Sequence, residues 1–413
     1  MNKKKILYIH HGKGLGGAPL SLLYLIQALD KTKYEPEVLF LHDSEVIDLY
    51  VKNGIKIAGI VSLHDFSHTK VWWFKWYHIP YFWRSFRDTI KTIRGAADLW
   101  LDKIKPDIVH LNTSSLIAWG KTAHKKKIPV VWHIREPLAD GYFGLRKTFI
   151  KSCVTKYASA IVPICKHDAK PWTNSSKVQI VYNAVDPHKF NFELSAIKFL
   201  EQHKLDSATP IILFLGGLSH EKGTDVILKA FKLVVQKLPQ TKLLIAGYFD
   251  PNLNSTSWLK NLSPSHKFKK NALKIYNELK QNIILLGPTQ NIPAAMAASK
   301  VVVFPSNFGH FARPVIEAGF MKKTVIASNF APLDELIKTT PEECTGFLID
   351  PKNIAAWADK LLLLLTNNDL NKKMGEEGYR FCTAKFDLKN QIKIVEQIYS
   401  KFYISSTESN KSV

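Results

Sequence analysis

Short apolar runs alternate with helical patterns along almost the whole chain, and this alternation restricts the fold to the α/β class. The runs carry valine, isoleucine and leucine at successive positions, as do strands that are buried on both faces of a parallel sheet. Strands are predicted in a first set at residues 3–10, 35–42, 107–112, 128–134 and 159–165, and in a second set at residues 210–216, 241–247, 282–287, 301–305 and 324–328. Two such sets predict two Rossmann-like, doubly wound domains that face each other across a cleft.

The division between the two sets predicts the domain boundaries. An N-terminal domain is expected over residues 1–190 and a C-terminal domain over residues 191–388, with a polar, irregular stretch around residues 190–208. A helix over residues 389–404 is expected to cross back to the N-terminal domain. The polar end, residues 405–413, is expected to be a disordered tail.

Composition excludes several classes of protein. The 46% hydrophobic and 22% charged content is that of a globular chain rather than a disordered one. No apolar run reaches the roughly 18 to 20 residues needed to span a bilayer, and the leucines at 361–365 are expected in an amphipathic helix. The 4 cysteines are scattered without a C-x-x-C pair, so neither a disulfide framework nor a zinc site is predicted. A reducing cytoplasm is the expected compartment.

The formal net charge of +22 implies an anionic partner or surface. Residues 66–94 interleave aromatic side chains with lysine and arginine, a mixture that the headgroup region of a membrane favours. This segment is therefore expected to dock onto a membrane surface. One alternative is that several of these aromatics are core residues. Stacking on single-stranded nucleic acid is disfavoured because no basic-aromatic sheet motif accompanies them, and no nucleic acid partner is expected.

Three polar signals follow predicted strands, at the edge where open α/β sheets bind ligands. Gly16 and Gly17 belong to a glycine-rich turn after the first strand, which allows close approach of the backbone to a ligand. Lys222 is able to reach a diphosphate, although a surface lysine beside a helix start is common. His133 fits either a contact with a sugar hydroxyl or a satisfied core histidine, and His110 carries the same ambiguity.

Residues 301–319 indicate a buried strand, a loop and the first turns of a helix that carries one carboxylate, Glu317. Pro314 stands at a plausible first helical position. The free backbone N–H groups and the positive dipole end of such a helix suit a phosphate, and Glu317 is able to accept hydrogen bonds from ribose hydroxyls. An ordinary first-turn glutamate is the alternative interpretation.

Four segments, in this order, resemble the retaining family 4 glycosyltransferases (group 1 type), which have the GT-B fold, and the resemblance covers nearly the whole chain. They are VYNAVDPHKF at 181–190, FLGGLSHEKG at 214–223, the donor segment at 298–328 and GFLIDPKN at 346–353. The resemblance implies an acceptor-side N-terminal domain and a nucleotide-sugar-binding C-terminal domain. It also implies a hexosyltransferase-type reaction with retention, in which the leaving phosphate takes the acceptor proton.

The resemblance further implies roles for individual residues. Glu317 would bind the ribose, Lys222 would hold the diphosphate and stabilise the charge that develops as it leaves, and His133 would contact the transferred sugar. The other implied donor-binding positions are Gly16, Gly17, Gly216, Gly247, His310, Phe311, Arg313, Pro314 and Val315. Because the chain has no D-x-D sequence, neither an obligatory metal nor another cofactor is expected.

Ala312 replaces a glycine that is usual in the family, and two glycines also depart from the family pattern. Gly309 stands where the family has the first of two glutamates, and Gly217 stands where it commonly has an arginine that pairs with the diphosphate. His220, His310 and Arg313 are expected to compensate. The expected function is sugar transfer from a nucleotide sugar to a glycan or lipid-linked acceptor in surface polysaccharide biosynthesis, at the inner face of the cytoplasmic membrane. The alternative is a catalytically degenerate relative that binds a glycan or nucleotide sugar, or scaffolds an assembly complex.

Overall fold

A computed structural model describes residues 3–11, 14, 16–66, 79–138, 144–251, 264–289 and 291–408. The chain forms two compact units. Unit 1 comprises residues 1–184 together with residues 388–413, and unit 2 comprises residues 185–387. Each unit is built on one six-stranded sheet, and the two sets of apolar runs predict five of the six strands in each.

The sheet of unit 1 has the strand order β3-β2-β1-β4-β5-β6, and all its strand pairs are parallel. Its strands are β1 (Lys4–His10), β2 (Tyr34–Phe40), β3 (Lys56–Ile60), β4 (Ile108–Leu111), β5 (Val130–Ile134) and β6 (Ala160–Pro163). The apolar runs predict all of these except β3. The residues of β3 are exposed or only partly buried, so they form no continuous apolar run.

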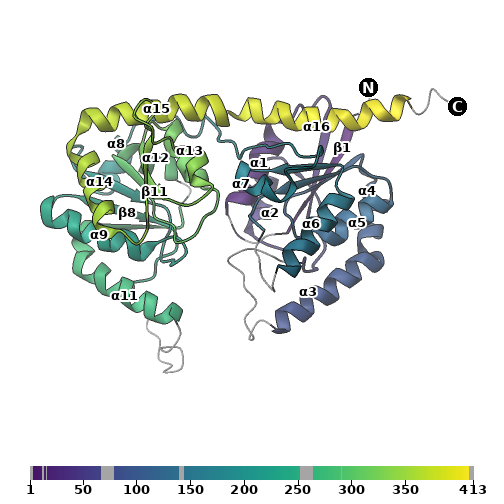
Figure 1. The fold of residues 1–413 in the computed structure, drawn as a ribbon, viewed down its shortest axis with the longest axis horizontal. Helices are drawn as coiled ribbons and strands as arrows, with labels where there is room; N and C mark the ends of the chain where they lie inside the picture. Colours follow the sequence, from purple (N-terminus) through teal and green to yellow (C-terminus); the bar gives the residue numbers. More distant parts are fainter. Residues whose placement is uncertain are drawn as a thin grey trace. The chain divides into compact units, whose positions relative to one another are not determined.

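Helices cover the sheet of unit 1. They are α1 (Gly17–Ala28), α2 (Glu45–Lys52), α3 (Ile79–Lys91), α4 (Ala97–Ile104), α5 (Ile117–Lys125), α6 (Leu145–Tyr157), α7 (Lys166–Ala169) and α16 (Leu388–Glu408). Helix α16 lies beside α1, and its Ile392, Val395 and Ile398 join the core around β1 (Figure 1). Helix α16 extends into the range expected to be a tail, and residues 409–413 lie outside the described residues.

Unit 2 repeats this topology with the order β12-β11-β10-β7-β8-β9. Its strands are β7 (Ile211–Phe214), β8 (Lys242–Ala246), β9 (Ile283–Gly287), β10 (Val301–Phe304), β11 (Thr324–Ser328) and β12 (Gly346–Ile349). Its helices are α8 (Ile197–Gln202), α9 (Thr224–Lys237), α11 (Pro264–Leu279), α12 (Ile292–Ala298), α13 (Arg313–Phe320), α14 (Ile354–Thr366) and α15 (Asn368–Phe386). Helix α8 lies within the stretch expected to be irregular, where Phe199 is buried.

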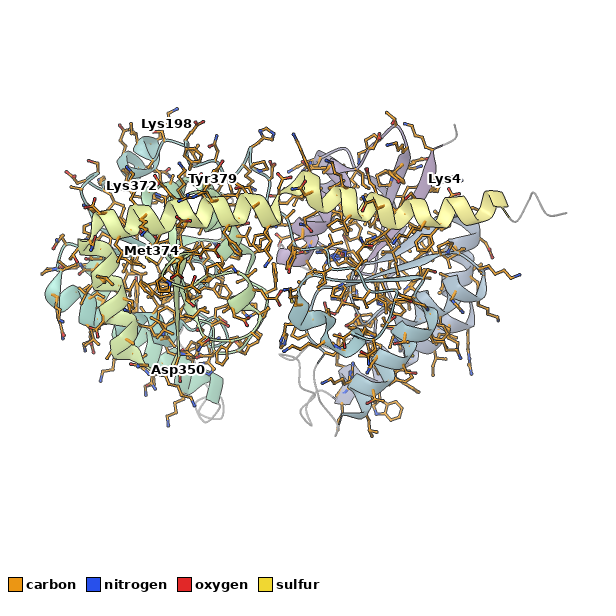
Figure 2. The ribbon with its side chains drawn as sticks, turned by 45° about the horizontal axis from the view of Figure 1, so that its top comes forward. Lys4, Lys198, Asp350, Lys372, Met374 and Tyr379 are labelled. Carbon is orange, nitrogen blue, oxygen red and sulfur yellow. The ribbon has the colours of Figure 1, made fainter. Side chains whose placement is uncertain are left out.

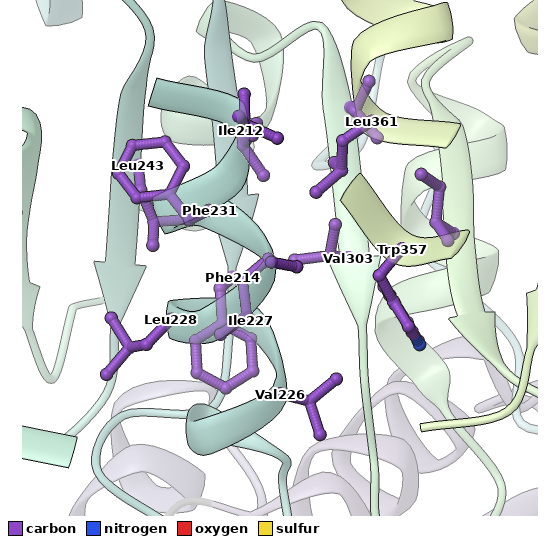
Figure 3. Close-up of a cluster of buried hydrophobic side chains, with 14 of the residues drawn as sticks. Ile212, Phe214, Val226, Ile227, Leu228, Phe231, Leu243, Val303, Trp357 and Leu361 are labelled. Carbon is purple, nitrogen blue, oxygen red and sulfur yellow. The ribbon is translucent and has the colours of Figure 1, made fainter. Parts of the chain in front are cut away.

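The core of unit 2 lies between the sheet and helices α9 and α14 (Figure 3). On α14 the buried residues Trp357, Leu361, Leu364 and Leu365 follow the i, i+4, i+7, i+8 spacing of one helix face, which confirms the amphipathic helix expected there. Helix α15 buries Met374 and exposes Lys372 (Figure 2).

The strand order fixes where each unit can build a site. In unit 1 the winding direction reverses between β1 and β4, and in unit 2 it reverses between β7 and β10. Because neighbouring strands are parallel, the loops that follow them meet at the same edge of the sheet. Ligands of open α/β sheets bind at such switch points.

Candidate functional site

The loops that follow β7 and β10 meet at the switch point of unit 2. The β7 loop carries Lys222 and the β10 loop carries His310, and Lys222 Nζ lies 2.9 Å from His310 Nε2. Gly223 permits this approach, since its φ is +77° and a Cβ at this position would lie 1.7 Å from the Pro305 carbonyl oxygen. Two segments that lie far apart in the sequence therefore form one polar group.

The protonation state of His310 follows from its surroundings. Burial, followed by the charge of Lys222, lowers the pKa of His310 to about 3, so the imidazole is neutral at neutral pH. An ammonium only donates, and His310 Nε2 therefore accepts from Lys222 while Nδ1 carries the hydrogen. That Nδ1 lies 3.3 Å from both the Ser306 hydroxyl and the Phe308 carbonyl oxygen. Burial also lowers the pKa of Lys222, and the nearby Glu221 opposes this shift.

Helix α13 carries the predicted ribose ligand Glu317, but the structure pairs it with Arg313. Arg313 Nε lies 2.8 Å from Glu317 Oε1, and each side chain is only 8% exposed. Burial raises the pKa of Glu317, while the charge and hydrogen bond of Arg313 oppose the shift. The two residues that the sequence assigns to separate parts of a donor are thus joined as an i, i+4 ion pair.

The N-terminus of α13 presents backbone groups at the same switch point. Its N-cap residue, Ala312, makes no side-chain capping hydrogen bond, and Pro314 occupies the first turn as predicted. Phe311 is partly exposed in the preceding loop, whereas Val315 is buried. The helix start therefore combines a positive dipole end with backbone N–H groups that its N-cap side chain leaves uncapped.

The predicted glycines Gly216, Gly217 and Gly247 lie together after β7 and β8. Gly217 N–H donates to the Ala246 carbonyl oxygen at 3.0 Å. The φ of Gly217 is +57°, and a Cβ there would lie 2.4 Å from the Tyr248 carbonyl oxygen. The arginine that commonly occupies this position in the family would not fit this backbone.

Gly309, the other departure from the family pattern, is equally enclosed. A Cβ at Gly309 would lie 2.1 Å from the Ala331 carbonyl oxygen. The loop has therefore packed around a glycine, and a glutamate side chain would displace backbone atoms. Of the compensating residues that the sequence suggests, His310 reaches Lys222, whereas the largely exposed His220 lies 3.4 Å from Asp225.

Gly309→Ala is expected to lower the unfolding free energy of the protein by about 1–3 kcal/mol, because the added methyl group overpacks the loop. Gly378→Ala is the matched control in the same unit, since its Cβ would meet no atom closer than 3.8 Å. Urea unfolding of both variants measures the difference. Equal stabilities for the two variants would show that the loop accommodates a side chain at Gly309.

A second polar group lies in unit 1, where β1, β4 and β5 end. His10 Nδ1 lies 3.1 Å from Asn112 Nδ2, across the switch point of this sheet. Arg135, which follows β5, donates to Asn112 Oδ1 and, at 2.6 Å, to Asn183 Oδ1. The side chains that end three separate strands are thus linked by hydrogen bonds.

His110 and His133 differ in how their ring nitrogens are hydrogen-bonded. His110 is fully buried, with Nδ1 2.7 Å from the Tyr399 hydroxyl and Nε2 3.1 Å from His133 Nδ1, so it is a satisfied core histidine. His133 Nε2 is buried and has no hydrogen-bond partner among the described residues. It lines a narrow pocket together with Ser21 and Arg135. Burial, followed by the charge of Arg135, lowers the pKa of both histidines, which are neutral at neutral pH.

The glycine-rich turn of unit 1 leads into α1. Gly16 is the N-cap of this helix, and no other atom of the described residues lies within 4 Å of a Cβ built at Gly16 or Gly17. Gly16 N–H donates to the Gly14 carbonyl oxygen at 3.0 Å. Gly12 of the predicted turn lies outside the described residues. The described part of the turn is open, as a loop that approaches a ligand needs to be.

Two family profiles match the chain. The one described as Glycosyltransferase Family 4 matches residues 15–189, and the one described as Glycosyl transferases group 1 matches residues 196–381. The trehalose synthase of Thermococcus litoralis is 27% identical over 265 residues, 62% of this chain and 60% of that protein. The capsular polysaccharide biosynthesis glycosyltransferase CapM of Staphylococcus aureus is 23% identical over 214 residues, 51% of each chain. The chain thus matches between half and three fifths of the length of these relatives.

The fold agrees with solved structures. HepE of Anabaena, crystallised in complex with UDP and glucose, superposes with a TM-score of 0.74 at 17% identity, over 96% of this chain and 99% of that one. Together with the two parallel six-stranded sheets, this likeness confirms the expected GT-B fold.

Proposed function

We propose that this chain, which belongs to the group 1 glycosyltransferases of family 4, transfers a sugar from a nucleotide-sugar donor to a glycan or lipid-linked acceptor, with retention of configuration. The observation that carries the proposal is the contact between Lys222 and His310 at the switch point of unit 2. A lysine held by a neutral imidazole, beside the uncapped start of α13, suits a diphosphate.

In this proposal the donor is held by the residues of unit 2. The Lys222 ammonium keeps further N–H donors when one of them faces His310, and these bind the diphosphate together with the first N–H groups of α13. They also stabilise the charge that develops as the diphosphate leaves. Glu317 accepts hydrogen bonds from the ribose hydroxyls. The leaving phosphate oxygen takes the acceptor proton, so the reaction requires no separate protein base.

His133 of unit 1 is proposed to contact the sugar, and Gly16 and Gly17 the phosphates. A glycan acceptor is supported by CapM, whose name assigns it to capsular polysaccharide biosynthesis. A nucleotide-sugar donor is supported by HepE, which binds UDP and glucose in its crystal. Surface polysaccharide assembly at the inner face of the cytoplasmic membrane is the setting we propose.

A scan of nucleotide sugars for thermal stabilisation tests the proposal, because a ligand at 100 times its dissociation constant stabilises the folded state by about 2.7 kcal/mol. One donor is expected to stabilise the protein and to release its nucleotide diphosphate when an acceptor is added. Stabilisation without release would favour the alternative, a degenerate relative that only binds. If no nucleotide sugar stabilises the protein, the proposal is wrong.

The membrane contact is proposed to involve the α3 surface, which we define as Ile79, Tyr81, Trp83 and Phe86 with the neighbouring exposed cations Arg84 and Lys91. Trp83 is 61% exposed, Ile79 54% and Phe86 44%, so these side chains are not core residues. Aromatic rings beside cations fit the headgroups of anionic lipids. Residues 67–78 of the predicted segment lie outside the described residues, and in the described part of the chain no helix has the length and hydropathy to cross a bilayer.

Trp83→Ser is expected to weaken binding to vesicles that contain phosphatidylglycerol by about tenfold, because one large aromatic side chain no longer leaves water. Sedimentation with vesicles at two salt concentrations measures the change. Ile197→Ser is the control, since Ile197 is 63% exposed on α8 and has no part in the α3 surface. Equal losses in both variants, or no binding by the unaltered protein, would refute this contact.

A further inference from the structure

A chain of hydrogen bonds runs through the core of unit 1 from helix α16 to His133. The Tyr8 hydroxyl lies 2.8 Å from the Tyr399 hydroxyl, which lies 2.7 Å from His110 Nδ1. His110 Nε2 lies 3.1 Å from His133 Nδ1. All four side chains are buried, so water cannot replace any of these partners without cost.

Arg135 sets the direction of this chain. Its guanidinium Nη2 lies 3.5 Å from His133 Nδ1, and a guanidinium only donates, so it opposes a hydrogen on that nitrogen. His133 Nδ1 is therefore the acceptor of the His110 Nε2–H bond. His110 Nδ1 then accepts from the Tyr399 hydroxyl, which in turn accepts from Tyr8. In this arrangement each hydrogen bond from Tyr8 to His133 has one donor and one acceptor, and the hydrogen of His133 is on Nε2.

His133 lines the narrow pocket of unit 1, and its Nε2 is buried without a partner among the described residues. The Ser21 hydroxyl lines the same pocket, is also buried, and likewise has no hydrogen-bond partner there. The pocket has room for a water-sized group. A buried N–H and a buried hydroxyl from residues that line one pocket suit one hydroxyl group of a ligand, because a hydroxyl both accepts and donates.

We propose that Tyr399 and His110 are positioning residues that hold His133 in the tautomer with its hydrogen on Nε2. This N–H, together with the Ser21 hydroxyl, binds one hydroxyl group of the sugar. That the ligand is a sugar rests on the proposed function, whereas the tautomer is a property of the free protein. The C-terminal helix thereby takes part in ligand recognition through Tyr399.

Nitrogen NMR of the protein labelled at its histidines tests the first part without any ligand, and the signals of His133 are identified from a His133→Asn variant. In the unaltered protein, His133 is expected to carry its hydrogen on Nε2. Tyr399→Phe removes the donor to His110 and is expected to shift the tautomer ratio of His133 by about fivefold, the effect of one hydrogen bond. Tyr8→Phe leaves that donor in place and is expected to change little.

Tyr34→Phe is the matched control. Tyr34 packs edge-on against Tyr399, with the ring centroids 5.6 Å apart, and its hydroxyl lies 3.4 Å from the Glu396 carbonyl oxygen of the same helix. The substitution removes a hydroxyl from this core but none from the chain to His133, so the tautomer ratio should not change. A hydrogen on Nδ1 of His133 in the unaltered protein, or equal ratios in Tyr399→Phe and Tyr34→Phe, would overturn the assignment.

Donor binding tests the second part. Ser21→Ala is expected to raise the dissociation constant of the stabilising nucleotide sugar about fivefold and to leave the tautomer of His133 unchanged. Tyr399→Phe is expected to change both the dissociation constant and the tautomer ratio of His133. It should raise KM rather than lower kcat, because the sugar hydroxyl is bound before the reaction begins. If Ser21→Ala binds the donor normally, the pocket does not hold the sugar. Failure of every nucleotide sugar to bind would refute the proposed function while leaving the tautomer result standing.

Discussion

Replacing Glu317 with alanine is expected to abolish the thermal stabilisation that the preferred nucleotide sugar confers. The ribose would lose its acceptor, and hydrogen bonds to a charged group are worth about 1.5–3 kcal/mol each. The same variant should also lose about 3–5 kcal/mol of unfolding free energy, because the buried Arg313, which lies 2.8 Å from Glu317, loses that carboxylate. Thermal unfolding with and without the donor measures both effects.

A double variant separates the two losses. Arg313→Met with Glu317→Met replaces the buried pair by apolar side chains and should recover most of the unfolding free energy. The nucleotide sugar should still fail to stabilise this variant against heat. Glu377→Ala is the control. It breaks an exposed pair with Arg380 on α15, so it should cost no more than about 1 kcal/mol and leave donor stabilisation intact. Normal stabilisation of the double variant by the donor would show that Glu317 does not bind the ribose.

The unfolding free energy of unit 1 is expected to fall steeply as the pH drops below about 6.5. Burial lowers the pKa of His10, His110 and His133 far below the value of about 6.5 that they have in the unfolded chain. Above that pH the three histidines are neutral in both the folded and the unfolded state, so they do not make the unfolding free energy depend on pH. Below it the unfolded chain binds protons that the folded unit does not. The unfolding free energy then falls by about 1.4 kcal/mol per pH unit for each histidine, and by about 4 kcal/mol per pH unit for all three.

Unit 2 supplies the comparison, since only His310 there has a pKa that is lowered among the described histidines of that unit. Native-state hydrogen exchange read by mass spectrometry reports the opening free energy of each unit separately. Between pH 7.5 and 5.5 the slope for unit 1 should be about three times that for unit 2. His10→Gln should reduce the slope of unit 1 by the contribution of one histidine, since the unfolded chain then binds about one proton fewer. Equal slopes in the two units would contradict the neutral state of these buried histidines.

Much of the fold follows from local sequence, and the exceptions have physical causes. Continuous apolar runs predict the central strands because both faces of a parallel sheet are covered, and the spacing of Trp357 and Leu361 predicts the buried face of α14. Strand β3 escapes prediction because it is an edge strand of the sheet with little burial. A helix after residue 388 that returns to the N-terminal domain is predicted, but the side chains that α16 contacts are not.

The candidate site is predicted in its positions and less in its pairings. Lys222 and Glu317 follow strands and His133 lies near the end of β5, so their place at a sheet edge can be inferred from sequence. That Lys222 contacts His310, and that Arg313 pairs with Glu317, depends on backbone paths that no local pattern fixes. No local sequence pattern points to Tyr399, because 289 positions separate it from His110. The packing of α16 into the core of unit 1 brings Tyr399 to His110.

The two glycine departures change meaning once the structure is known. In the sequence they indicate missing side chains. In the structure the Gly309 and Gly217 backbones lie so close to Ala331 and Tyr248 that the loops have no space for those side chains. The polar group at this position is instead the Lys222 and His310 pair, so the donor side of unit 2 is rearranged rather than simply depleted.

Sugar transfer itself is the most direct test of the proposed function. The purified protein is incubated with the nucleotide sugar that stabilises it and with a lipid-linked glycan extract, and mass spectrometry follows the nucleotide and the glycan together. Equal amounts of released nucleotide diphosphate and of glycan heavier by one sugar are expected, and both should be lost in Lys222→Met. A donor that binds tightly but is never consumed with any acceptor, in the unaltered protein, would contradict the transferase assignment and leave a binding protein on the GT-B fold.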